Sequence, residues 1–456
     1  PIQDSSFSTL LKGRWTQGMS GASITNGTPN VYTWSTATST SDASNWAALE
    51  NLGATYTPGQ GSLVYVFSDD NGPDVAGDAG FPKTINIEGI EPQSDQSLTN
   101  LLNTNVNGWT LLGNPFKQDV DWDAFNLSNL SNSVYVWDHN SSDWKTWNGM
   151  IGDLESGEIG AFNSFFVQTT GAGPTLQIPL SAKTGSKTRF YGKQLAKSET
   201  PWVSLKLTNT THSNELWVMF SDAAQIGFDN MDALKLQPLS AEYVLIASKA
   251  DSLLLDINAL PYSEMEIRVP LHFESTSLGE HTIELSGNEL PDDWKIVLYD
   301  AELNIRTNLS TNYSFDLGSK QKRETQAVSV TQTPQLKQVR KNGTTEERFV
   351  LIITPALMVG TEDDLGIPRE VELYQNYPNP FNPSSVIRFG VPDQAPVRLE
   401  VFDILGRKVM TLVNGELTQP GRYNIAFDGR NLASGMYIYR LVIGDKVLTK
   451  KMTLIK

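Results

Sequence analysis

The side chains best able to do chemistry are few in this sequence, and their spacing matches none of the common catalytic motifs. The four histidines are His139, His212, His272 and His281. None of them forms the H-x-x-x-H or H-E-x-x-H spacing of a helical zinc site. A G-x-S-x-G nucleophile elbow and a G-x-x-x-x-G-K-[ST] phosphate loop are also missing. Because the chain has no cysteine, a Cys nucleophile, thiolate metal ligands and disulfides are excluded.

Paired carboxylates are the remaining route to catalysis, as in glycosidases. The candidate acids, in the same part of the sequence as Trp122, Trp144 and Trp147, are Asp121, Asp123, Glu155 and Glu158. A glycosidase pair could be assembled from distant strands. Acids on hairpins usually face solvent, however, and have no catalytic role. We therefore predict no catalytic residues and no enzymatic activity.

One loop has the composition of a calcium site. Asp69, Asp70, Asp74 and Asp78 offer several carboxylate oxygens within ten residues, and oxygen ligands are what Ca²⁺ prefers. The spacing does not fit the EF-hand pattern, and an ordinary acidic turn explains the same residues. Calcium is the one cofactor that the sequence suggests.

Tryptophans suggest a second kind of site. Trp144 and Trp147, on the hairpin partner expected for the second V-Y-x-W strand, could contribute to a face that stacks on a sugar ring. The alternative is that they lie in a core, as is expected for Trp34 and Trp137 on two V-Y-x-W segments.

The elements that must position these residues are strands. Apolar and polar residues alternate over short runs separated by Gly, Asn, Asp and Pro, and helical periodicity is nearly missing, with residues 43–52 and 94–104 as the only candidates for a helical turn. We predict an all-β fold of tandem β-sandwich domains followed by a small immunoglobulin-like C-terminal sandwich. A net charge of −16 disfavours nucleic acid as a partner. The sequence contains no run of 18 apolar residues, and so no membrane-spanning segment is predicted.

Residues 1–183 contain an internal repeat. The first copy has a V-Y-x-W strand at 31–34, then Trp46, then a strand that begins at Gly61. The second copy has a V-Y-x-W strand at 134–137, then Trp144 and Trp147, then an aromatic strand that follows Gly160. The second copy opens with an apolar strand at 108–113 for which the first copy has no counterpart. We hypothesise that another chain, or a separately cleaved upstream peptide, fills this gap by strand addition. The alternative is that Pro1 is simply where the sequence was cut. Since Pro1 follows no signal peptide, we expect a processed product or a fragment.

A second region covers residues 184–357 and is predicted to be a β-sandwich. Ten short strands are expected in it, at 202–207, 215–220, 234–236, 243–247, 253–257, 264–271, 281–285, 294–300, 313–315 and 348–354. The stretch between 318 and 347 reads as a long loop. Residues 358–371 read as a linker, because Gly, Asp, Glu and Pro accumulate there.

The last region, residues 372–456, alternates in the same way and is divided by Gly- and Pro-containing turns. Six strands are expected in it, at 385–391, 397–403, 407–413, 421–427, 435–443 and 446–454. Their number and length predict a minimal immunoglobulin-like sandwich. Three prolines within residues 376–383 make the approach to it stiff.

Four strings in this region resemble the type A C-terminal sorting domain of type IX secretion substrates. They are NYPNPFNP at 376–383, VFDILGRKV at 401–409, FDGRNLASGMY at 427–437 and TKKM at 449–452. The departure is Phe427, where Trp is common in the family. Residues 1–355 more weakly resemble the part that precedes this tail in large secreted adhesin-like proteins.

The resemblance implies export to the outer cell surface or the medium of a bacterium of the Bacteroidota type. It also implies three partners, namely the type IX translocon, a shuttle protein and a sortase that cuts within the linker. Lys450, Lys451 and Lys456 are the residues predicted to dock. The alternative is that these lysines only protect an edge strand from aggregation.

Together these features favour a non-catalytic, adhesin-like or structural surface protein, self-associating through the N-terminal gap into a fibre. The alternative is a glycan-binding accessory region of a larger secreted hydrolase.

Overall fold

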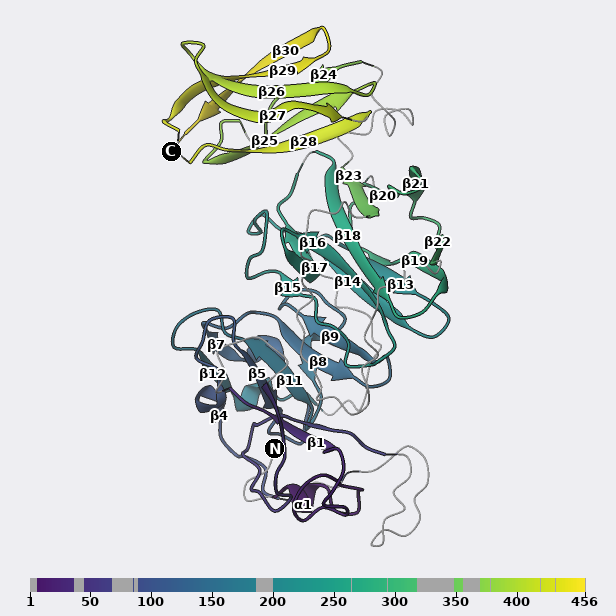
Figure 1. Ribbon diagram of the computed structural model, residues 1–456. Coiled ribbons are helices and arrows are strands. Elements are labelled where there is room, and N and C mark those ends of the chain that lie inside the picture. The colour runs from purple at the N-terminus through teal and green to yellow at the C-terminus, as the bar shows by residue number, and fades with distance from the viewer. Residues whose placement is uncertain are drawn as a thin grey trace. The chain divides into compact units, whose positions relative to one another are not determined.

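The computed structural model describes most of the chain. The described residues are 6–36, 45–67, 85, 89–185, 200–263, 265–292, 294–317, 348–355, 370–377, 379–418, 420–430 and 432–455. The chain divides into two compact units, Pro1–Ala356 and Leu357–Lys456, and each is described by itself (Figure 1).

Strands dominate both units. Helical segments among the described residues are limited to the single-turn α1 (Phe7–Leu10) and the 3-10 turns η2 (Thr99–Leu101), η3 (Trp122–Ala124), η4 (Glu155–Gly157) and η5 (Leu180–Ala182). The prediction of an all-β fold is therefore confirmed, whereas the sandwich arrangement stays a prediction. No helix in the described ranges has the length and apolar character needed to cross a membrane.

Two sheets near the N-terminus carry the sequence repeat. The first has the order β2-β1-β3 and the second the order β9-β8-β11-β5. Their bounds are β1 Val31–Trp34, β2 Trp46–Ala48, β3 Ser62–Val64, β5 Trp109–Gly113, β8 Val134–Asp138, β9 Asp143–Trp147 and β11 Ser164–Gln168.

Pairing registers in these sheets match one another. Trp34 lies opposite Trp46 in the first sheet, and Trp137 lies opposite Trp144 in the second. Strands β1, β2 and β3 thus correspond to β8, β9 and β11. Strand β5 has no counterpart among the described residues of the first sheet.

Two small sheets cover the second repeat. One has the order β4-β12-β7 and the other pairs β6 with β10. Their bounds are β4 Gln96–Ser97, β6 Val120–Asp121, β7 Asn126–Ser128, β10 Glu158–Ile159 and β12 Thr175–Ile178. A core that includes Phe116, Trp122 and Phe165 lies beneath them.

The largest sheet of the first unit has eleven strands. Ten run in the order β21-β20-β23-β18-β16-β17-β14-β13-β19-β22, and β15 pairs with β17. Only β14 and β17 are parallel among the described pairs of this sheet. The bounds are β13 Trp202–Thr208, β14 Ser213–Phe220, β15 Ala233–Leu234, β16 Val244–Ala250, β17 Leu253–Leu260, β18 Ile267–Ser275, β19 Gly279–Asn288, β20 Lys295–Asp300, β21 Ile305–Asn308, β22 Tyr313–Leu317 and β23 Phe349–Thr354.

Strand β14 shows how this sheet joins the repeats. Its residues alternate between two cores, because successive side chains of a strand point to opposite faces. Leu216 and Val218 pack in the sheet's own core, and Trp217 and Met219 pack in a second core with Trp109 of the repeat region. Residues on both sides of the predicted boundary at 183/184 therefore share one core.

The second unit has two sheets around one core. The sheets have the orders β24-β25-β28 and β27-β26-β29-β30. The bounds are β24 Glu372–Leu373, β25 Ser384–Val391, β26 Ala395–Asp403, β27 Lys408–Thr418, β28 Gly421–Asp428, β29 Gly435–Ile443 and β30 Lys446–Leu454. Phe389 and Phe427 of the first sheet and Leu399 and Tyr439 of the second pack in the same cluster.

Candidate functional site

The proline-rich segment of the second unit lies along the last strand. The backbone N–H of Phe381 donates to the carbonyl of Thr453 at 2.9 Å, and the N–H of Ile455 donates to the carbonyl of Phe381 at 2.9 Å. Asn379 accepts from the N–H of Thr453 through its side-chain oxygen at 2.8 Å. Gln375 donates to the carbonyl of Lys451 at 2.6 Å. The segment therefore covers the end of β30 in a parallel direction.

Aromatic packing fixes the same segment to the core. Phe381 is fully buried, and its ring centre lies 5.5 Å from that of Phe427 in an edge-to-face arrangement. This contact explains why Phe427 serves where Trp is common in similar tails, since it keeps an aromatic ring against Phe381.

The predicted docking lysines lie on or beyond β30. Lys450 and Lys451 are opposite Tyr439 and Ile438 of β29, and Lys451 is exposed while Lys450 is partly buried. Lys456 lies outside the described residues. Docking by these lysines stays a prediction.

The turn expected between residues 403 and 407 exposes apolar side chains, which the sequence reasoning did not anticipate. Ile404 and Leu405, between β26 and β27, are 70% and 72% exposed. Asp403 holds the turn, because its Oδ1 accepts from the N–H groups of Leu405 and Arg407 at 2.9 Å each. These bonds, aided by the Arg407 side chain, hold the pKa of Asp403 below its usual range.

The tryptophans predicted to stack on a sugar are buried in the first unit. Trp144 and Trp147 are 6% and 7% exposed. The indole N–H of Trp144 donates to the carbonyl of Gln237 at 3.0 Å, and that of Trp147 donates to Asp123 at 2.9 Å. The sugar-stacking interpretation is corrected accordingly, because both rings pack in hydrophobic cores. The acids of the calcium hypothesis, Asp69, Asp70, Asp74 and Asp78, lie outside the described residues.

Two histidines support one hairpin. His281 is fully buried, with Nε2 at 2.7 Å from the Ser275 hydroxyl and Nδ1 at 2.9 Å from the carbonyl of Gly279. His272 lies 3.0 Å from Glu274. A buried imidazole joined to both ends of the turn between β18 and β19 fits a structural role.

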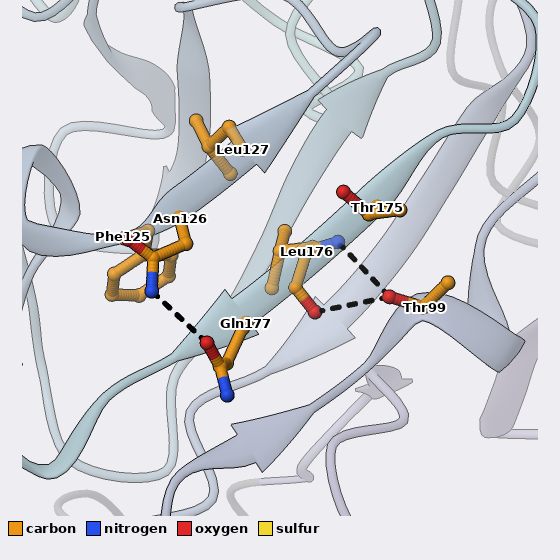
Figure 2. A pocket seen from close by; sticks show the side chains of 7 residues that line it. All are labelled: Thr99, Phe125, Asn126, Leu127, Thr175, Leu176 and Gln177. Atoms are coloured by element: carbon orange, nitrogen blue, oxygen red, sulfur yellow. Dashed lines mark hydrogen bonds between the residues drawn. The ribbon is translucent and has the colours of Figure 1, made fainter.

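A shallow hollow lies over the sheet β4-β12-β7, and Figure 2 shows its lining. Some of its polar groups are paired with one another. Asn126 donates to Gln177 at 3.0 Å, and the hydroxyl of Thr99 bonds to the backbone of Leu176. No charged side chain lines it. It therefore offers no charged group to a ligand.

A second pocket, which we name the polar pocket, is of a different kind. It measures about 460 Å³ and lies between the β8–β9 hairpin and strands β13 and β14. All nine residues that line it are polar, namely Asp138, Asn140, Ser141, Asp143, Lys145, Lys206, Ser213, Asn214 and Glu215.

Hydrogen bonds fix the inner wall of the polar pocket. Asp143 accepts from the N–H of Trp144 at 2.8 Å and from the Asn214 side chain at 2.6 Å. Lys145 donates to Asp153 at 3.0 Å. These bonds join the repeat region to the eleven-stranded sheet and hold charged groups in fixed positions.

Burial sets the electrostatics of this wall. Burial raises the pKa of Asp143 to about 7. The negative charge of Asp153 also raises this pKa, and the positive charge of Lys235 lowers it. Burial also raises the pKa of Glu215. The pKa of Lys145 is raised as well, because Asp153 and Asp143 outweigh the opposite effect of its burial. Such shifts are typical of pockets that bind polar ligands, and also of structural ion pairs.

The outer edge of β3, on the side away from β1, is the remaining candidate for a binding site. Gln60 pairs with Leu112 at the start of this edge, and the hydroxyl of Ser164 bonds the backbone of Ser62. N–H groups alternate in direction along a strand. Since Tyr65 donates towards β1 and Ser62 donates away from it, the N–H of Val64 points away from β1. No named strand among the described residues pairs with that side of β3.

Comparison with known proteins gives two family matches. The model described as "Domain of unknown function (DUF8693)" matches residues 13–325. The model described as "Secretion system C-terminal sorting domain" matches residues 375–456. No curated protein matches the chain.

The second match confirms the resemblance seen in the tail, and with it export by type IX secretion to the medium or the outer cell surface. The match also implies that the type IX secretion machinery recognises this chain. The first match extends over more than half of the sequence. The chain therefore belongs to the family of the domain of unknown function DUF8693, and it is a type IX secretion substrate by virtue of its C-terminal sorting domain.

Proposed function

We propose that the exported protein is a non-catalytic, adhesin-like structural component of the cell surface that assembles by strand exchange at β3. One observation carries the proposal: the sheet β2-β1-β3 repeats three strands of β9-β8-β11-β5 and has no counterpart of β5 among the described residues. Strand addition supplies main-chain hydrogen bonds to such an edge.

The repeat also indicates what kind of strand would fit. In the second copy the position is filled by Trp109–Gly113, whose five residues are all buried. An apolar strand of this type, supplied by another chain, is the proposed occupant at β3. Partners joined in this way would form a fibre, because each chain would contribute a strand to the next.

A labelled peptide with the sequence of residues 108–115 tests the proposal on the full chain. It is expected to bind the unchanged protein and to bind Val64→Ala. Val64→Pro is expected to abolish binding, because proline removes the outward N–H while the β1 bonds of Leu63 and Tyr65 remain. Fluorescence anisotropy measures the binding.

Two results would count against strand exchange. Equal binding to Val64→Ala and Val64→Pro would show that the peptide does not pair with this edge. Absence of binding, combined with a monomeric mass in analytical ultracentrifugation, would remove the basis for assembly at β3.

The alternative function, a glycan-binding region of a larger secreted hydrolase, has different support. It no longer rests on Trp144 and Trp147, which are buried. The polar pocket favours it instead, since its nine lining residues offer both donors and acceptors.

A further inference from the structure

Two charged side chains at the mouth of the polar pocket keep hydrogen-bonding capacity. Lys206 of β13 and Glu215 of β14 lie opposite each other in register. Their ammonium nitrogen and carboxylate oxygen are 3.9 Å apart, with 33% and 24% of the side chains exposed. This distance exceeds that of a hydrogen bond. Both groups can therefore bond to a ligand that enters the pocket.

The wall behind this pair is rigid. Asn214 is 2% exposed and its side chain is held at both ends, donating to Asp143 and accepting from the N–H of Ile246 at 2.8 Å. Asp138 is similarly fixed by the N–H of Asn140 and the hydroxyl of Ser141. A pocket whose polar groups are held in place binds with a smaller loss of side-chain entropy.

The chemistry of the lining decides the class of ligand. Three carboxylates and two ammonium groups line the pocket, so their charges nearly balance and neither a strong anion nor a strong cation is favoured. A hydroxyl group both donates and accepts, and so it can bond Lys206 and Glu215 together. We propose that the polar pocket binds a saccharide through its hydroxyl groups, which accept from Lys206 and donate to Glu215.

This site is separate from the edge of β3. It is built from β8, β9, β13 and β14, and its occupation requires no second chain. The inference goes beyond the proposed assembly, and either can fail without the other. On the surface of a cell, the two together would join a glycan to an assembled fibre.

Saturation-transfer NMR with the full chain tests the proposal. The probes are the methyl glycosides of glucose, galactose, mannose and N-acetylglucosamine, each at about 1 mM, where weak sugar binding becomes measurable. At least one glycoside is expected to receive saturation. The double variant Lys206→Met with Glu215→Leu is expected to weaken its binding at least about tenfold, because two hydrogen bonds to charged groups are lost.

The double variant removes one charge of each sign and keeps side chains of similar length, so the net charge of −16 is unchanged. Lys408→Met with Glu280→Leu, which lies outside the pocket, is the matched control and should bind like the unchanged protein. Binding that survives in the pocket variant would overturn the assignment. So would saturation of putrescine or citrate, added as charged probes, with none of any glycoside.

Discussion

At the scale of single residues, burial gives ordinary amino acids unusual properties. Asp143 follows the turn of a hairpin, where the sequence suggests a solvated acid. It is 5% exposed, because β13 and β14 cover it from a distant part of the chain. Its raised pKa is a consequence of tertiary packing, and so no local pattern could have predicted it.

The pH dependence of stability should report this carboxyl. Because the pKa of Asp143 rises from 3.8 to about 7 on folding, the folded chain binds the proton more tightly than the unfolded chain does. Its contribution is full below pH about 4 and is lost as the pH rises to about 7. Asp143→Asn should remove this pH dependence. Since its amide nitrogen would face the donating side chain of Asn214, the test is the slope of stability with pH and not its level.

Urea unfolding at several pH values between 4 and 8 measures the effect. Asp316→Asn, an exposed acid on β22, controls for the lost negative charge and should follow the parent curve. If the free energy of unfolding changes with pH in the same way for the parent and for Asp143→Asn, the carboxyl has an ordinary pKa.

Phe381 allows a second comparison between single residues. Phe381→Ala should destabilise the second unit by about 3–5 kcal/mol, because a large buried ring is replaced by a cavity. Ile404→Ala should change stability by less than about 0.5 kcal/mol, since Ile404 is 70% exposed. Thermal unfolding followed by near-UV circular dichroism compares them, and similar effects of both would contradict the packing described for Phe381.

At the scale of elements, the strands rich in buried apolar residues were well predicted, and the more exposed strands were not. Strand β14 was expected at 215–220 and covers Ser213–Phe220, because a run of large apolar residues is typical of a strand buried on both faces. Strand β21, with two exposed residues at its start, gave no such signal. Of the two segments expected to give helical turns, 94–104 contains η2, whereas 43–52 contains strand β2.

The loop after β9 gives a prediction for an element. Gly152 and Gly149 both have positive φ, at 145° and 88°. A Cβ on Gly152 would lie 2.0 Å from the carbonyl oxygen of Thr146, whereas one on Gly149 would meet only a side-chain oxygen at 3.7 Å. Gly149→Ala should therefore cost about 1–2 kcal/mol of backbone strain, and Gly152→Ala clearly more.

Denaturant unfolding of the two variants measures the difference. Because both glycines have positive φ, Gly149→Ala is the control for backbone strain. The additional loss of unfolding free energy in Gly152→Ala then measures the clash with the Thr146 carbonyl of β9. If both cost the same, the loop does not pack against β9 as described.

At the scale of the whole molecule, the sequence identified the second unit far better than the first. Short strings such as NYPNPFNP combine an unusual composition with a fixed order, so the sorting domain could be recognised without a structure. The core shared by Trp109 and Trp217 joins residues 108 positions apart, and nothing local indicates it. The polar pocket was missed for the same reason, since its walls come from strands distant in sequence.

Export should depend on the second unit alone. With the same signal peptide added to both, a chain ending at residue 356 should stay in the periplasm of a host that has type IX secretion, whereas a reporter protein joined to residues 357–456 should reach the outside. Immunoblots of cell fractions and medium measure both. Export of the shortened chain, or retention of the reporter in a host that exports the full chain, would show that the first unit also carries a sorting signal.

The contact between Phe381 and the end of β30 has a mechanical consequence. The two segments are parallel, so a pull on the chain before residue 370 and an opposite pull on its C-terminal end would slide them along each other. Bonds arranged in this way bear a load together, in shear, whereas bonds that open from one end break one after another. The sorting domain is thus built to resist traction between its two ends.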